Sequence, residues 1–169
     1  IGFCLVGSEM CIRDRHQTIS SMGGHSEWLI AHELGHQWWG DLVTCSSFHH
    51  IWLNEGFARF SEAIWDEASR GFEAYKSYWQ NHSYFGPGTI YVEEPQTAAL
   101  IFNGNLTYNK AGWVVHMLRG VMGDSLFFES LRSYGYNDSL AYSDVTTEDF
   151  KNVCEDISGL NLSNFFEQW

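Results

Sequence analysis

The chain has 169 residues, of which 44% are hydrophobic and 17% aromatic, and its formal net charge is −12. This is enough apolar material for the core of one domain or of part of one, and it excludes a disordered chain. The acidic balance disfavours nucleic acid and anionic membranes as partners. The sequence has no run of about 18 apolar residues, so it predicts no transmembrane segment.

The first fifteen residues, IGFCLVGSEMCIRDR, do not read as part of the fold. They lack the basic start and the small-residue cleavage site of a signal peptide. They resemble a translated sequencing-adapter junction. We therefore expect a foreign tail over residues 1–15 and a partial catalytic domain over residues 16–169. A genuine, poorly ordered N-terminal tail is the alternative.

The first predicted helix follows a polar loop with paired glycines. Ser26 is suited to be its N-cap, and the apolar pattern runs to Trp38 before Gly40 stops it. Ala31 and Gly35, four residues apart, give this helix a narrow side that another element can approach closely.

The rest of the chain predicts further helices joined by two irregular segments. The first of these contains an extended piece at Val43 and Thr44. The second, over residues 83–108, holds both prolines and a β-like run at residues 89–92. Long irregular segments inside compact domains are often functional. The apolar periodicity predicts helices over residues 52–70, 72–82, 110–122, 125–134, 147–158 and 164–169.

Polar residues and glycines mark where these helices begin and end. Asp124 and Ser163 are expected to act as N-caps. The sequence from Thr146 to Asp149 has the form of a capping box. Helix ends are expected at Gly71, Gly123, Gly135 and Gly159.

One group of residues has the spacing of a metal site. His32 and His36 stand four apart on the first predicted helix, so their imidazoles lie on one face, one turn apart. Glu55 can supply a third ligand to a zinc ion. Glu33 can flank the metal without binding it, as the general base of a zinc hydrolase does. The HExxH pattern alone also occurs on ordinary helices, as two surface histidines and a helix-forming glutamate.

The residues around this pattern resemble the M1 family of zinc aminopeptidases, which belong to the gluzincins. The motif continues as QWWGD over residues 37–41, and eighteen residues separate the second histidine from Glu55, which lies in WLNEGFA over residues 52–58. The resemblance implies a mainly α fold, the helical part of a thermolysin-like α+β peptidase catalytic domain. It also implies one Zn²⁺ ion, held by His32, His36 and Glu55, with Glu33 as the general base.

Two further segments bear on the resemblance. Tyr108-Asn109-Lys110 is similar to the family's Tyr-x-Lys segment, whose tyrosine hydrogen-bonds the oxyanion of the tetrahedral intermediate, so Tyr108 is the expected stabiliser. Without the family, Tyr108 reads as a packed aromatic residue.

The family's Gly-x-Met-Glu-Asn type segment carries the glutamate that holds the substrate's amine. Here HQT at residues 16–18 matches the end of the bacterial version, but residues 13–15 are Arg-Asp-Arg. The resemblance therefore implies that this glutamate and the flanking domains of the parent chain are missing.

The expected function is hydrolysis of N-terminal residues from peptides by a zinc-dependent aminopeptidase. The alternatives are a zinc-binding but inactive fragment, a non-catalytic scaffold of the same fold, and a gluzincin endopeptidase. Peptides are the expected partners, and the sequence assigns no cellular location.

Three other features leave alternatives open. Glu62, two turns after Glu55, either accepts a hydrogen bond from a ligand histidine or is a solvated glutamate. Arg119 is expected to pair with an acid rather than with substrate. Cys45 and Cys154 are expected to be separate thiols, with a disulfide as the alternative.

Overall fold

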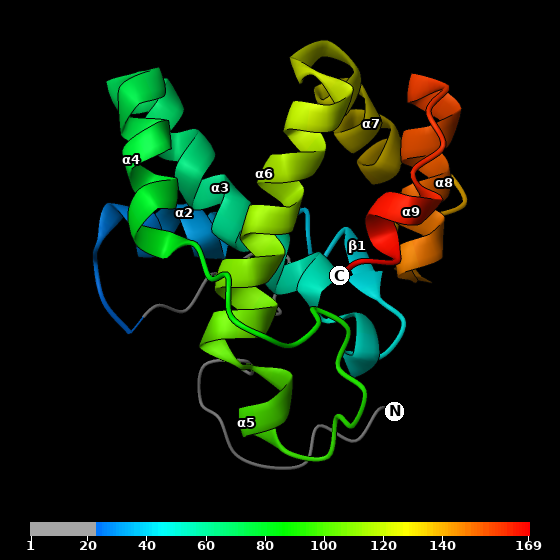
Figure 1. The fold of residues 1–169 in the computed structure, drawn as a ribbon, viewed down its shortest axis with the longest axis horizontal. Helices are drawn as coiled ribbons and strands as arrows, with labels where there is room; N and C mark the ends of the chain where they lie inside the picture. The colour runs from blue at the N-terminus through cyan, green and yellow to red at the C-terminus, as the bar shows by residue number, and fades with distance from the viewer. Residues whose placement is uncertain (1–22) are drawn as a thin grey trace.

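A computed structural model describes residues 23–169 (Figure 1). The expectations for the tail at residues 1–15 and for HQT at residues 16–18 lie outside the described residues. The prediction of a mainly α fold is confirmed, because the described part consists of helices and one two-stranded sheet. The longer helices are α2 (Glu27–Gly35), α3 (Trp52–Arg70), α4 (Phe72–His82), α6 (Ala111–Met122), α7 (Asp124–Tyr136) and α8 (Thr147–Ser158).

Shorter elements connect these helices. They are the 3₁₀-helix η1 (Phe48–His50), the single turns α5 (Ala98–Ile101) and α9 (Ser163–Phe166), and the π-helix η2 (Gly104–Lys110). In the described part of the chain, no helix combines the length and the apolar character needed to cross a bilayer.

The centre of the fold is α3, which α2, α4 and α6 surround (Figure 1). Most of its first three turns is buried, including Trp52 and Phe57. A Cβ added to Gly56 would lie 2.8 Å from the Cβ of Ala111. Because glycine has no side chain there, α3 and α6 pack closely at this crossing.

An aromatic cluster joins α3 to the C-terminal helices. The Phe57 ring lies 5.1 Å from the Trp39 ring and 5.0 Å from the Phe150 ring, centroid to centroid. Tyr134 of α7 stacks on Trp39 at 5.8 Å. Phe57, Phe150 and Tyr134 are among the largest fully buried side chains, and burial of apolar area is the main source of stability in a folded domain.

The sheet pairs two short strands that are about 100 residues apart in the sequence. β1 (Val43–Cys45) and β2 (Ser143–Val145) run parallel, with Val43 opposite Ser143 and Cys45 opposite Val145. The extended piece predicted at Val43 is therefore confirmed. The partner strand was not predicted, because three residues are too few for a period-2 pattern.

The predicted starts and ends of several helices agree with the structure. The Ser26 side chain accepts a hydrogen bond from the amide of Leu29. Thr146 and Asp149 form the complete capping box, and Gly159 ends α8 in the left-handed conformation. The first helix, however, ends at Gly35 rather than near Trp38, because the following amides bond to carbonyls three residues back in tighter turns.

Several local predictions are wrong. Gly135 does not end α7, which continues to Tyr136, and the last helix ends at Phe166 rather than at residue 169. Asp124 is the first residue of α7 and its carboxylate accepts hydrogen bonds from Arg119, so it does not cap the helix. Leu162 occupies the N-cap position of α9, and Ser163 lies within the helix. Residues 89–92 do not form a strand. The amide of Ile90 donates to the carbonyl oxygen of Trp169. At Asp124 and at Ile90 the bonding partner comes from another element of the fold.

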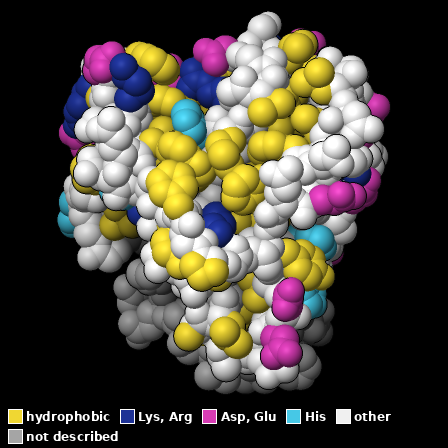
Figure 2. Space-filling view, in the orientation of Figure 1, with side chains coloured by type: hydrophobic (Ala, Val, Ile, Leu, Met, Phe, Trp, Pro, Cys, Tyr) yellow, Lys and Arg dark blue, Asp and Glu magenta, His cyan; other side chains and the backbone are white. Residues whose placement is uncertain are grey.

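Two features of the surface and core complete the fold. Figure 2 shows that hydrophobic side chains gather across the middle of one face, with most acidic side chains toward its edges. Cys154 is buried and Cys45 half-buried, and both are thiols rather than partners in a disulfide, as expected.

Candidate metal centre

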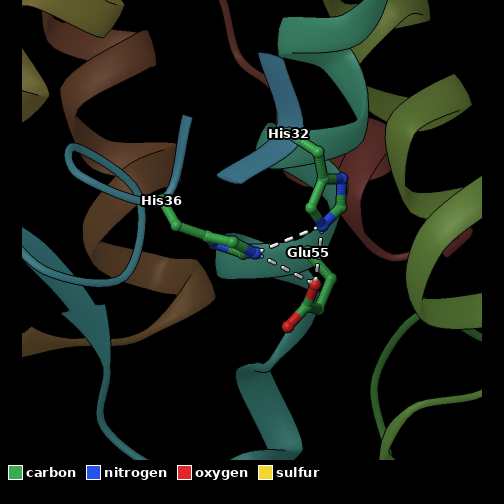
Figure 3. Close-up of side chains that lie close together, drawn as sticks. All are labelled: His32, His36 and Glu55. Atoms are coloured by element: carbon green, nitrogen blue, oxygen red, sulfur yellow. Dashed lines mark hydrogen bonds and ion pairs between the residues drawn. The ribbon is translucent and has the colours of Figure 1, made fainter. Parts of the chain in front are cut away.

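Three side chains from α2 and α3 converge on one point (Figure 3). The Nε2 atoms of His32 and His36 lie 3.2 Å apart, and each lies 3.4 Å from Oε2 of Glu55. Nitrogen and oxygen ligands at about 2.0–2.1 Å from a zinc ion lie about 3.3–3.4 Å from one another in a tetrahedron. The donor set and its spacing therefore fit three corners of a tetrahedral zinc site.

The local structure explains why these atoms meet. The helical repeat places the two histidines one turn apart on the face of α2 that packs against α3. A Cβ on Gly35 would lie 2.8 Å from Oγ of Ser61. The narrow side predicted for α2 thus allows α3 to approach and to bring Glu55 between the histidines.

The other nitrogen of each histidine is already engaged. Nδ1 of His32 lies 2.8 Å from Oε1 of Glu62, and Nδ1 of His36 lies 3.0 Å from the Trp39 carbonyl oxygen. Since a carbonyl and a carboxylate only accept, Nδ1 of each ring donates there, and Nε2 is the nitrogen left to face the site. The structure confirms that Glu62 accepts a hydrogen bond from His32.

The charges at the site stabilise one another. Burial alone would raise the pKa of Glu55, but hydrogen bonds from His32 and His36 lower it to about 2. Burial alone would lower the pKa of His32, but Glu55 and Glu62 raise it to about 9. Glu55 is therefore an ionised carboxylate that favours a positive partner.

A cavity of about 560 Å³ opens beside these ligands, and both predicted catalytic residues line it. Glu33 is mostly buried at its wall, next to the two histidines on α2. Tyr108 comes from η2, and its ring stacks on His32 with the centroids 5.9 Å apart and the planes 17° apart. The remaining wall is largely apolar, with Trp28 and Phe102 among its members. The cavity is thus suited to a ligand that places a polar group at the metal corner.

A sequence profile of the Peptidase family M1 domain matches residues 1–169. The chain belongs to peptidase family M1. Among its relatives, Aminopeptidase M1-D of Oryza sativa subsp. japonica is 33% identical over 150 residues, and the match covers 83% of this chain and 17% of that protein. Aminopeptidase N of Lactococcus lactis subsp. lactis is 29% identical over 153 residues, covering 83% of this chain and 18% of that protein.

Solved structures give the same family. An M1 zinc metallopeptidase from Deinococcus radiodurans is 27% identical, with a TM-score of 0.71, over 85% of this chain and 32% of that one. Aminopeptidase A of Legionella pneumophila has a TM-score of 0.74 at 22% identity, over 83% of this chain and 16% of that one, and supports the fold. The M1 chain described here spans about a fifth or less of the length of its curated relatives.

Two other histidines of this M1 chain, His49 and His116, bond to groups outside the metal centre. His49 bonds through Nδ1 to the Val92 carbonyl, and His116 bonds to the Tyr75 hydroxyl. Arg119 pairs with acidic side chains, as expected. Among the described residues, His32, His36 and Glu55 are the one set of three or more possible ligands whose donor atoms converge.

Two polar residues of this site were not predicted from the sequence. Arg59 donates to both carboxylate oxygens of Glu62 at 3.0 Å and to Oδ1 of Asn109. The spacing of Arg59 and Glu62, three apart on one helix face, is a local signal that could have revealed their ion pair. Nothing in the sequence connects Arg59 to Asn109, which is 50 residues away.

Proposed function

We propose that this chain is the zinc-binding part of the catalytic domain of an M1 metallo-aminopeptidase, which removes N-terminal residues from peptides. The observation that carries the proposal is the triangle of His32, His36 and Glu55, with edges of 3.2, 3.4 and 3.4 Å. The names of the relatives, which are aminopeptidases and zinc metallopeptidases, support the reaction class.

The chain contributes the wall of the cavity and one proton acceptor. A zinc ion held by the three ligands would supply Lewis acidity to the scissile carbonyl and lower the pKa of a water molecule. Glu33 follows His32 on α2 by about 100° of helix rotation, so its carboxylate flanks the ligands. It would accept the proton from the attacking water and return it to the leaving amine.

Tyr108 is the proposed oxyanion stabiliser. Its stacking on His32 keeps the ring beside a metal ligand and within the cavity wall. From there the phenol hydroxyl can donate a hydrogen bond to the oxygen that gains charge as water attacks the carbonyl. A donor held in place before the reaction stabilises that charge at little reorganisation cost.

The zinc site is tested by metal analysis of the purified chain. We expect one zinc ion per chain, and none in His36→Ala, because two ligands do not hold zinc tightly. His25→Ala is the matched control, since His25 is exposed and lies outside the site. Metal-free native protein, or equal zinc contents in the native and His36→Ala proteins, would contradict the proposal.

The reaction is tested with aminoacyl amide substrates, on a protein that carries this chain and an upstream amine-binding glutamate. Glu33→Gln is expected to lower kcat by at least about 10²-fold with zinc content unchanged. Cleavage only of blocked internal peptides would identify an endopeptidase instead. Zinc binding without hydrolysis of either substrate would identify a non-catalytic scaffold.

A further inference from the structure

Arg59 forms a bridge between α3 and the π-helix that carries Tyr108. Its Nε and Nη2 both donate to Oδ1 of Asn109, at 3.1 and 2.8 Å. Asn109 follows Tyr108 directly in η2. The planar guanidinium can make such a paired contact without losing its other donors, which a lysine ammonium cannot.

The same guanidinium continues the contact to a metal ligand. Nη1 of Arg59 donates to both oxygens of Glu62, and Oε1 of Glu62 accepts from Nδ1 of His32. A second donor, the Tyr78 hydroxyl, lies 2.8 Å from Oε2 of Glu62. A continuous series of hydrogen bonds therefore runs from the residue next to Tyr108 to a ligand of the metal.

The backbone around this bridge leaves room for it. A Cβ on Gly112, at the start of α6, would lie 3.0 Å from Cγ of Arg59 and 3.0 Å from the Trp79 ring. Together with the close crossing at Gly56, this lets α3 and the end of η2 lie near enough for one arginine to span them. Interactions between such closely packed elements transmit small displacements rather than absorbing them.

We infer that Arg59 and Asn109 are positioning residues that fix Tyr108 relative to His32, so that the oxyanion donor and the metal are held as one unit. This inference rests on the proposed function, because it assigns the bridge a role in that reaction. Glu62 is the central member: its side chain is only 4% exposed and that of Arg59 is 22% exposed. Partly buried, charge-assisted hydrogen bonds of this kind are stronger than those between surface residues.

A role in substrate binding is the competing explanation for Arg59, because the residue lines the cavity. Its hydrogen bonds point the other way: Nε, Nη1 and Nη2 each donate to Asn109 or Glu62. The two roles differ in a measurable way. A substrate-binding arginine affects KM, whereas a positioning arginine affects kcat and the affinity for zinc.

The test compares zinc affinity, by competition with a chromophoric chelator, in variants of the full chain. Asn109→Leu, which touches neither Glu62 nor His32, should lower the affinity about two- to tenfold, the equivalent of one lost hydrogen bond. Asn109→Asp keeps an acceptor for Arg59 and should restore the affinity. Asn105→Leu, an exposed position in the same π-helix, should leave it unchanged. An affinity in Asn109→Leu equal to that of the native chain would overturn the inference.

A double-variant cycle keeps the test decisive where a single variant folds poorly. Once Arg59→Met has removed the bridge, adding Asn109→Leu should cause no further loss of zinc affinity. Independent, additive losses would overturn the inference. In the active protein, Arg59→Met should lower kcat with KM unchanged, whereas a raised KM with unchanged kcat would identify a substrate contact instead. A native chain that binds no zinc would refute the proposed function itself, so the two failures are distinguishable.

Discussion

α3 anchors two charged clusters that differ in what they connect. The first is centred on Glu62, whose carboxylate accepts hydrogen bonds from His32, Arg59 and Tyr78. The second is centred on Arg119 of α6, whose guanidinium donates to Glu67 of α3 and to Asp124 of α7. In the first the buried centre is an anion, and in the second it is a cation.

The surroundings of the two clusters explain the difference. The Glu62 side chain is 4% exposed, and its carboxylate contacts His32, a candidate metal ligand at the cavity. The Arg119 side chain is 8% exposed, but its partners Glu67 and Asp124 are 26% and 69% exposed. The Arg119 ion, which also lies over the Tyr75 ring, ties three helices together. Two ion-pair clusters that both include a carboxylate of α3 therefore differ in role. The Glu62 cluster contacts the candidate metal site, and the Arg119 cluster contacts only other helices.

The largest effect that separates the clusters is expected from Arg119→Ala. Removal of the guanidinium leaves two carboxylates without their shared partner and an aromatic ring without its cation, so the free energy of unfolding should fall by about 2–3 kcal/mol. Urea unfolding of the metal-free chain measures this fall, and the zinc content should not change. The exposed Arg132 gives the control, Arg132→Ala, with little effect. A loss of zinc in Arg119→Ala would remove the distinction between the clusters.

A smaller effect, on zinc affinity rather than on the free energy of unfolding, is expected from Glu62→Gln. The amide accepts a weaker hydrogen bond from His32 and lowers the basicity of that ligand, so zinc affinity should fall about tenfold, roughly 1.4 kcal/mol. The same substitution in the other cluster, Glu67→Gln, should leave zinc affinity unchanged. Chelator competition measures both. Equal losses in the two variants would show that the clusters do not differ in function.

The smallest effect is a dependence of the free energy of unfolding on pH, caused by His116 beside the Arg119 cluster. Burial, with the nearby Arg119 guanidinium, lowers the pKa of His116, whose ring bonds to the Tyr75 hydroxyl. The unfolded chain takes up that proton at the ordinary value of about 6.5. The stability due to neutral His116 is therefore present above that pH and is lost as the pH falls toward the folded pKa.

Urea unfolding at about pH 7.5 and about pH 5.5 tests this sign. His116→Gln should reduce the loss of stability on acidification, because the glutamine does not titrate. Arg119→Met should reduce it also, since one cation beside His116 is removed. An unchanged pH dependence in His116→Gln would mean that groups other than His116 set it.

The sequence predicted those parts of the site that depend on local geometry. Two histidines four apart on a helix must share a face, whatever the rest of the chain does, and Glu55 belonged to a recognisable segment. The capping box at Thr146 and the left-handed Gly159 were predictable for the same reason, because each is complete within a few residues. The strand partner of β1 was not predictable, since it lies about 100 residues away in the sequence.

The sequence alone predicted His32, His36 and Glu55 as the candidate ligand set, because helix periodicity and a short segment of family resemblance are both local properties. Only the tertiary structure decided that these ligands form a triangle with edges of 3.2–3.4 Å, and that Arg59 joins Asn109 to Glu62. The physical reason is the crossing of α3 with α2 and α6. Gly35, Gly56 and Gly112 set how closely these helices approach, and no pattern within a single helix shows which residues will meet there.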